Sequence, residues 1–391
     1  MPSPSLVLPL KVPVRHDLTR PLSEWLDSEE QVATYQDTND EGNLSWIVPK
    51  PAFKSTACRQ EILRLAGLRN TLSDILQESH KASLESRSLE DCNEYHATLL
   101  EFEKRGFPTR DEASNGVNLT WRGAFSKRAE ETHYSLIYDR ACTLWNVAAL
   151  QSYLASIADL TTKDGCKTAI SLSQSAASIL STLRQLVENE DYMTVDLSKS
   201  MLSFWEKLLL AQGQLCIYRM ANLGGGTVRQ HTTLAHLVQA SASLYNEALS
   251  AAQDPRLDSE VPKQAKEWGI HCKNQSLISQ SRAVFHIALE HRLQQEHGQE
   301  IARLRQCVQT LKEAQGFAKV SAVQAQLQEV EGLVKMATDR LKHAEDDNRQ
   351  VYLDEVPRDL PEIRAQTMVK LNQPLAPTMT VTKAPMFAFV S

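Results

Sequence analysis

An apolar side chain recurs every three or four residues across 320–344, and this spacing restricts the possible folds more than any other feature. The apolar positions are Val320, Val323, Leu327, Val330, Val334, Ala337, Leu341 and Ala344. A seam of more than three heptads predicts a long one-sided helix. The flanking positions lack the complementary charges of a dimerising zipper. We therefore expect the seam to pack within the chain against a helix over 298–314, joined by a turn near Gly316; a dimer seam is the alternative.

Helical spacing also runs through most of the chain before this stretch. We expect a helix from Cys58 onward and a second over 89–102. The apolar residues of 134–157 cover more than one side, which predicts a helix buried nearly all round. Further helices are predicted over 163–187, 197–221, 230–252 and 263–296. The chain has only 14 glycines and 15 prolines among 391 residues, which leaves room for long helices.

Both ends of the chain and one internal stretch depart from the helical pattern. Residues 6–14 include Pro9 and Pro13, which predicts short strands at a sheet edge, because proline cannot donate a ladder hydrogen bond. Residues 28–56 are polar and acidic and predict an exposed loop or insertion. Four prolines beyond Pro357 predict an extended segment over 358–391. The predicted fold class is mainly α, with short N-terminal β-strands and an extended C-terminal segment.

Composition limits the classes of partner and the cellular compartment. The net charge is −6 and lysines and arginines are dispersed, which argues against nucleic acid or an anionic membrane as the main ligand. The seven cysteines stand singly, without a CxxC pair, as expected of reduced thiols. No stretch supplies the roughly 20 apolar residues of a bilayer span, and the N-terminus does not resemble a secretory signal. We expect a cytoplasmic protein.

The sequence offers no catalytic or metal-binding motif in a fitting context. The sequence contains no GxSxG, HExxH, phosphate-binding loop or GxGxxG. A phosphatase-like Cys-x5-Arg spacing joins Cys58 to Arg64, but no glycine between them could turn backbone amides toward a phosphate, so we interpret it as a chance match. His286, His291 and His297 are spaced to lie on different faces of a helix. We expect no enzyme, no cofactor and no metal.

Seven segments in collinear order carry a family resemblance. They are LTWRGAF at 119–125, YDRACTLWNVAAL at 138–150, TKDGCKTA at 162–169, LAQGQ at 210–214, EIARL at 300–304, DNRQVYLDEVP at 347–357 and TMVK at 367–370. Together they resemble the BRO-one domain, the Alix-type domain of ESCRT adaptor proteins, over about residues 5–390. The resemblance implies one curved domain with a tetratricopeptide-like helical core.

The resemblance also implies a binding site. Such domains hold the C-terminal amphipathic helix of an ESCRT-III subunit of the Snf-seven/CHMP-four type in a shallow apolar groove. The matching positions here are Lys167, Ile217, Thr233, Leu237 and Met368. Lys167 would pair with a partner carboxylate, and Tyr352 matches a tyrosine that is phosphorylated in some members. Without the resemblance, Ile217 and Leu237 would be interpreted as core residues.

This sequence departs from the family pattern at three places. Thr233 stands where a large aliphatic residue is usual, which should weaken that part of the groove. Lys163 replaces an acidic residue of Alix, which would alter recognition of charges on the partner. The stretch 28–56 is longer than the usual opening.

The function implied by the resemblance is a monomeric, non-enzymatic adaptor, recruited peripherally to endosomes for multivesicular-body sorting. One alternative is an ambient-pH signalling scaffold of the Rim-twenty/PalA type, whose coiled-coil arm we would expect beyond this chain. Another is the targeting domain of a larger phosphatase-like protein, whose catalytic domain this chain is too short to include.

Overall fold

The computed structural model describes residues 5–23, 56–78, 86–104, 117–125, 130–189, 194–223, 230–321 and 324–371. The chain divides into two compact units. The N-terminal unit comprises Pro9–Leu150, Asn189–Thr194 and Leu375–Ser391, and the C-terminal unit comprises Met1–Leu8, Gln151–Glu188 and Val195–Pro374. The predicted loop over 28–56 lies outside the described residues except for Thr56, as do residues 372–391.

A small antiparallel sheet in the N-terminal unit has the strand order β1-β2-β3. The strands are β1 (Val12–Pro13), β2 (Leu119–Arg122) and β3 (Glu130–His133). Pro13 lies on the edge strand, opposite Trp121, where its missing N–H leaves no ladder bond unmade. The predicted edge strand is confirmed, although it covers only two residues of the stretch 6–14.

The helices of the N-terminal unit are α2 (Thr56–Glu78), α3 (Ser86–Lys104) and the start of α4 (Leu136–Ile157). Cys58 and Arg64 both lie on α2, as expected, so the phosphatase-like spacing runs along a helix. Side chains of α4 are buried on all sides over 136–152, apart from the half-buried Arg140. The prediction that this helix is buried nearly all round is confirmed.

A buried carboxylate connects the helices of this unit to its sheet. Asp139 on α4 accepts hydrogen bonds from Trp121 Nε1 on β2 (2.6 Å), from Arg69 Nε on α2 (3.2 Å) and from the Tyr95 hydroxyl on α3. The Arg69 and Asp139 side chains are 2% and 0% exposed, so they form a buried ion pair. Arg69 Nη1 also donates to the carbonyl of Val14 (2.7 Å). We call these residues the Asp139 cluster.

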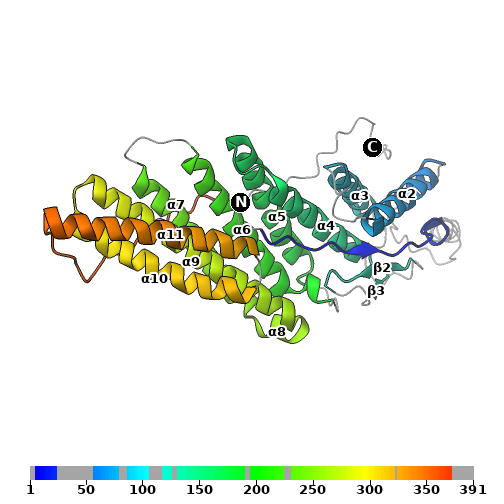
Figure 1. Ribbon diagram of the computed structural model, residues 1–391. Helices are drawn as coiled ribbons and strands as arrows, with labels where there is room; N and C mark the ends of the chain where they lie inside the picture. The colour runs from blue at the N-terminus through cyan, green and yellow to red at the C-terminus, as the bar shows by residue number, and fades with distance from the viewer. Residues whose placement is uncertain are drawn as a thin grey trace, which may run out of the picture. The chain divides into compact units, whose positions relative to one another are not determined.

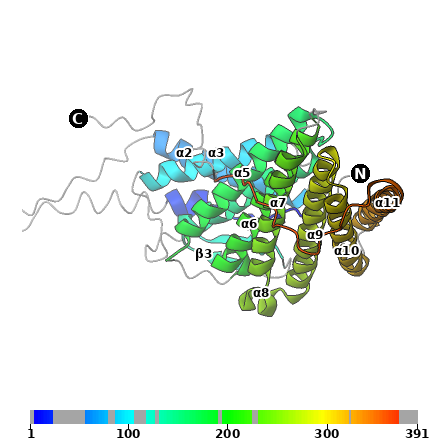
Figure 2. The same ribbon diagram turned by 90° about the vertical axis from the view of Figure 1, so that its left-hand side faces the viewer.

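The C-terminal unit is a succession of packed helices. In chain order they are α5 (Lys163–Leu186), α6 (Lys199–Asn222), α7 (His231–Ala252), the short α8 (Pro255–Glu260), α9 (Pro262–Leu293), α10 (His297–Ser321) and α11 (Gln324–Asp347). Apart from α8, each packs against the next, in an arrangement visible in Figures 1 and 2. These helices form the predicted helical core, whereas the predicted curvature of the whole domain stays a prediction.

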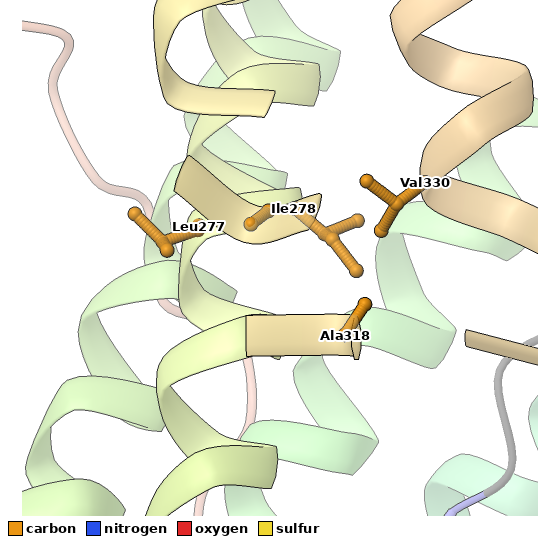
Figure 3. Packing of buried hydrophobic residues seen from close by; sticks show 5 residues of the cluster. Leu277, Ile278, Ala318 and Val330 are labelled. Carbon is orange, nitrogen blue, oxygen red and sulfur yellow. The ribbon is translucent and has the colours of Figure 1, made fainter. Parts of the chain in front are cut away.

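From Leu327 to Ala344 the apolar seam packs within the chain, as predicted. Three core clusters lie along α11, and they contain Val330, Ala337 and Ala344 in turn, one heptad apart. Each cluster also takes residues from α9 and α10. Figure 3 shows Val330 of α11 and Ala318 of α10 beside Ile278 of α9. The seam therefore faces a two-helix partner surface instead of a single helix.

The predicted turn near Gly316 is wrong. The preceding helix, α10, runs from His297 through Gly316 to Ser321, and the seam position Val320 lies on it with 65% of its surface exposed. A glycine inside a helix costs only about 1 kcal/mol. Burial of Ala314 and Ala318 against α9 on either side offsets that cost.

Candidate helix-docking site

The C-terminal strap, which we define as residues 353–371, has no helix or strand and lies against the helices of the C-terminal unit (Figure 2). This confirms the predicted extended segment for its described part. Arg303 Nη2 on α10 donates to the carbonyl of Pro361 (2.5 Å). Further along, the Gln366 N–H donates to the carbonyl of His236 on α7 (3.0 Å). The strap is therefore attached to helices far from it in sequence.

A tight turn directs the chain from α11 into the strap. The Asn348 side chain donates to the Asp354 carbonyl (3.0 Å) and accepts from the Asp354 N–H (2.9 Å). Between them Leu353 takes a left-handed conformation with φ 57°. The strap then passes so near α10 that a Cβ on Gly298 would lie 2.0 Å from the Glu355 carbonyl oxygen. The motif at 347–357 thus builds this turn.

Tyr352 lies in the same turn, and 46% of its surface is exposed. Its ring stacks on that of His297 with centroids 3.5 Å apart and an interplanar angle of 11°. The position of Tyr352 is compatible with a modification site, and its phosphorylation stays a prediction.

The centre of the candidate site is Gln214 of α6, whose side chain is fully buried. Its Nε2 donates to the carbonyls of Leu237 on α7 (3.0 Å) and Gln366 on the strap (3.2 Å). Its Oε1 accepts from the backbone N–H groups of Met368 (2.9 Å) and Val369 (3.2 Å). One neutral amide therefore joins α6, α7 and the strap, and we call this arrangement the Gln214 joint.

Helices α6 and α7 run antiparallel beside this joint. The Gln214 side chain reaches Leu237, and three residues earlier the Ala211 carbonyl accepts from Ser241 (3.4 Å). Continuing this register by one turn places Ile217 at about the level of Thr233. The exposed Thr233 and the half-buried Ile217 therefore lie at one level of neighbouring helices.

Helix α5 extends this row on the other side of α6. A Cβ on Gly213 would lie 3.4 Å from the Ser173 Cβ of α5 and 3.3 Å from the Val369 side chain of the strap. The backbones of α5, α6 and the strap therefore pass close to one another here. Toward the end of α5, Arg184 pairs with Glu206 of α6, seven residues before Gly213 (Nη2–Oε2 3.2 Å). The two helices are therefore antiparallel, and Lys167 lies near the level of Arg219.

Leu237 and Met368 thus lie at the Gln214 joint. The helix registers place Ile217, Thr233 and Lys167 further along α6, α7 and α5, and the environments of the five residues differ. Met368 is 54% exposed, and Thr233 is also exposed. Lys167 pairs with Asp164 of its own helix (Nζ–Oδ1 2.9 Å), with the two side chains 65% and 91% exposed. An exposed pair of this kind contributes at most about 1 kcal/mol, so a partner carboxylate could replace Asp164 at little cost.

Leu237 differs from the other predicted residues because only 6% of its surface is exposed. In the absence of a partner it is a core residue of this chain, packed between α7 and its neighbours. Substitution of Leu237 would disturb folding, whatever its part in binding. It is therefore a poor position for a binding test, whereas Met368 is a good one.

Other motif residues hold parts of this chain together. In EIARL, Glu300 pairs with Arg340 of α11 (Nε–Oε1 2.9 Å). In LAQGQ, Gln212 Nε2 donates to the Leu6 carbonyl of the N-terminal segment (3.1 Å). In the motif at 138–150, the Asn146 side chain bonds both the N–H (2.8 Å) and the carbonyl (2.9 Å) of Lys11. Much of the motif pattern therefore serves folding.

Among the described residues, the side chains considered as catalytic or metal-binding candidates have other surroundings. They contain no cluster of three or more His, Cys, Asp or Glu side chains that could hold a metal ion. Burial raises the pKa of the Cys272 and Cys307 thiols to about 12, so neither is a nucleophile near neutral pH. His286 bonds the Tyr218 hydroxyl (2.9 Å) and His291 pairs with Glu296 (2.6 Å), which accounts for the two histidines separately.

Gln214 was not predicted from the sequence as a site residue, although it belongs to a motif. One signal could have indicated it: Gln212 and Gln214 flank a glycine within an otherwise apolar helix, and a buried amide there needs partners. The identity of those partners depends on the strap, whose Met368 is separated from Gln214 by 154 residues. The role of Gln214 therefore emerges only from the fold.

Comparison with known proteins decides the family. The family model described as the BRO1-like domain matches residues 47–389, which is most of the chain. The chain belongs to the BRO1-like domain family. The predicted resemblance is therefore confirmed, while the predicted domain limits 5–390 stay a prediction.

Two curated relatives and one solved structure illustrate the range of BRO1-domain proteins. The chain is 26% identical to the pH-response regulator protein RIM20 of Yarrowia lipolytica over 90% of this chain and 44% of that protein. It is 28% identical to the vacuolar-sorting protein BRO1 of Arabidopsis thaliana over 78% of this chain and 36% of that protein. This chain thus spans less than half of either relative.

The solved structure is an ALIX BRO1 domain in a complex with CHMP4C. It superposes with a TM-score of 0.75 and 22% identity, covering 98% of this chain and 99% of that one. At this identity the similarity establishes the fold: mainly α, with a short N-terminal sheet and an extended C-terminal segment.

Proposed function

We propose that this BRO1 domain is a non-enzymatic adaptor of the ESCRT pathway. It docks the C-terminal amphipathic helix of an ESCRT-III subunit across α5, α6, α7 and the strap, in the helix-in-groove mode. The observation that carries the proposal is that Ile217, Thr233 and Met368, which are half-buried or exposed, belong to segments that meet at the Gln214 joint. The ALIX BRO1 domain, which has the same fold, was solved with an ESCRT-III subunit, and this supports the same class of partner here.

The chemistry of this surface fits an amphipathic helix. The exposed thioether of Met368 and the half-buried Ile217 offer apolar contact area, and methionine adapts to side chains of different shape. Lys167 offers one cation at the edge, which would set the orientation of a partner carboxylate more than it would raise affinity. Thr233 supplies less apolar area than a leucine would, so we expect modest affinity.

The proposed place of action is the cytoplasm, with recruitment of a monomer to the endosomal surface. Among the described residues, no helix is both long and apolar enough to cross a bilayer. The net charge of −6 gives no electrostatic reason for direct binding to anionic lipid. Recruitment would therefore depend on the protein partner.

Calorimetric titration with the C-terminal peptides of the host's ESCRT-III subunits tests the proposal. The wild-type chain should bind at least one peptide, and Met368→Asp should weaken that binding at least about tenfold without lowering the melting temperature. Met336→Asp is the matched control, since Met336 is 45% exposed on α11. Equal binding by wild type and Met368→Asp would refute the docking surface.

A second candidate, an ambient-pH signalling scaffold, is favoured by the relative named as a pH-response regulator. Both candidates share the docking step, so a peptide titration cannot separate them. Replacement of the matching region of Yarrowia lipolytica RIM20 by this chain can: restored growth at alkaline pH would support the signalling scaffold. Restored sorting in an Arabidopsis BRO1 exchange, without the pH response, would support the endosomal adaptor.

A further inference from the structure

The Gln214 side chain uses its full hydrogen-bonding capacity, which packing of α6 alone does not require. A buried primary amide offers two donor hydrogens and an acceptor oxygen with two lone pairs. In Gln214 all four are used, two by carbonyls and two by backbone N–H groups, at 2.9–3.2 Å. Three of the four partners belong to the strap, so the side chain holds the strap at one defined register.

The register matters because neighbouring strap residues face different surroundings. Val369 is 8% exposed and lies against Gly213, whereas Met368 is 54% exposed. In an extended chain, successive side chains point to opposite faces. A one-residue slip that brings Met368 into the place of Val369 would bury the methionine and expose the valine.

We infer that Gln214 is the positioning residue of the docking surface: its amide sets the strap register that presents Met368 to a partner helix. This inference rests on the proposed function, because it assigns a role within the same surface. Gln214 touches no partner itself. It acts through the backbone of the strap and the first half of α7.

The neighbouring Gln212 provides an internal comparison. It lies two residues away on the same helix, it is 8% exposed, and its Nε2 also fastens an extended segment, through the Leu6 carbonyl (3.1 Å). It bonds the N-terminal segment and not the strap. If loss of any buried hydrogen bond in α6 weakened peptide binding, substitution of Gln212 and of Gln214 should weaken it alike. If Gln214 positions the strap, only its substitution should weaken binding.

The experiment combines hydrogen exchange with peptide titration in the full chain. Gln214→Met keeps the length of the side chain and removes its hydrogen bonds. We expect the Met368 and Val369 amides to exchange at least about tenfold faster, and the ESCRT-III peptide to bind about tenfold more weakly. Gln212→Met should leave both quantities near wild type. Val369→Ala, which loosens the strap without altering α6, should weaken binding in the same direction.

Three outcomes would overturn the inference. The first is a folded Gln214→Met chain that binds the peptide as tightly as wild type. The second is unchanged exchange at Met368 and Val369 in that variant. The third is equal loss of binding in Gln212→Met. If Gln214→Met fails to fold, Val369→Ala decides in its place. Met368→Asp distinguishes failure of the positioning role from failure of the proposed function. If Met368→Asp binds the peptide as tightly as wild type, the docking surface is refuted, and the positioning role with it.

Discussion

Asp139 of the N-terminal unit and Gln214 of the C-terminal unit are both fully buried, and each joins several parts of the chain, but they differ in charge. Asp139 is part of an ion pair with Arg69, whereas Gln214 bonds the strap with a neutral amide. A buried ion that loses its partner costs about 3–5 kcal/mol, whereas a neutral hydrogen bond left unmade costs about 1–3 kcal/mol. The strap is therefore the part that can loosen while the fold persists.

The largest expected effect on stability is at the Asp139 cluster. Asp139→Ala leaves the Arg69 guanidinium buried without its carboxylate, so we expect a loss of about 3–5 kcal/mol in the free energy of unfolding, measured by urea denaturation. Asp164→Ala, at a side chain 91% exposed, should change stability by less than about 1 kcal/mol. The double variant Arg69→Met with Asp139→Leu removes both charges and should be more stable than Asp139→Ala. If it is equally unstable, the unpaired Arg69 charge is not the cause of the loss.

Leu237 tests the boundary between core and surface in the C-terminal unit. Leu237→Ala should cost about 2–5 kcal/mol of unfolding free energy because it opens a cavity beneath α7. Met368→Ala should leave the melting temperature within a degree or two and weaken only peptide binding, since the side chain is half exposed. Thermal melts of both variants check this, and a Leu237→Ala chain as stable as wild type would contradict its burial.

Acidification should destabilise the C-terminal unit through two buried histidines of α9. Burial lowers the pKa of His271 to about 4, and burial together with His231 and Arg282 lowers the pKa of His286 to about 4, from 6.5. A lowered folded-state pKa gives stability that is complete above pH 6.5 and is lost as pH falls toward 4. Each histidine should account for about 3 kcal/mol across that window.

Urea midpoints between pH 7 and pH 4 measure this loss. His271→Gln should reduce the fall of the urea midpoint with pH by the contribution of one histidine. A chain whose midpoint does not fall over this range would show that folding does not lower the pKa of these histidines.

The smallest expected effect concerns the Lys167–Asp164 pair. Lys167→Ala should leave stability within about 0.5 kcal/mol, since the pair is exposed. It should slow association with an acidic peptide at low salt and matter less at high salt, because screening removes such interactions. Stopped-flow association rates at two salt concentrations check this. A rate that Lys167→Ala leaves unchanged at low salt would remove Lys167 from the site.

The sequence predicts the elements of this fold well where a single periodicity decides. The heptad spacing of Val330, Ala337 and Ala344 predicts α11 and its burial, and the all-round apolar pattern predicts the burial of α4. Gly316 misleads because packing on both sides of it outweighs its low helix propensity. Local preference fails where tertiary contacts oppose it.

The site was harder to predict, because its geometry depends on contacts across long separations. The resemblance indicated Met368 and Leu237, but periodicity could not tell that one is exposed and the other buried. That difference follows from the path of the strap, which Gln214 holds from 154 residues away. A buried glutamine in an apolar helix indicates that partners exist without identifying them.

The most direct test of the central claim uses the methyl signals of the methionines in an NMR titration. The ESCRT-III peptide that binds best in calorimetry is added to the chain labelled at its methionine methyls. We predict that the Met368 signal shifts or broadens with the binding isotherm, while the signal of Met336, on α11, stays in place. Binding that moves Met336 and leaves Met368 unchanged would place the partner helix elsewhere and contradict the account.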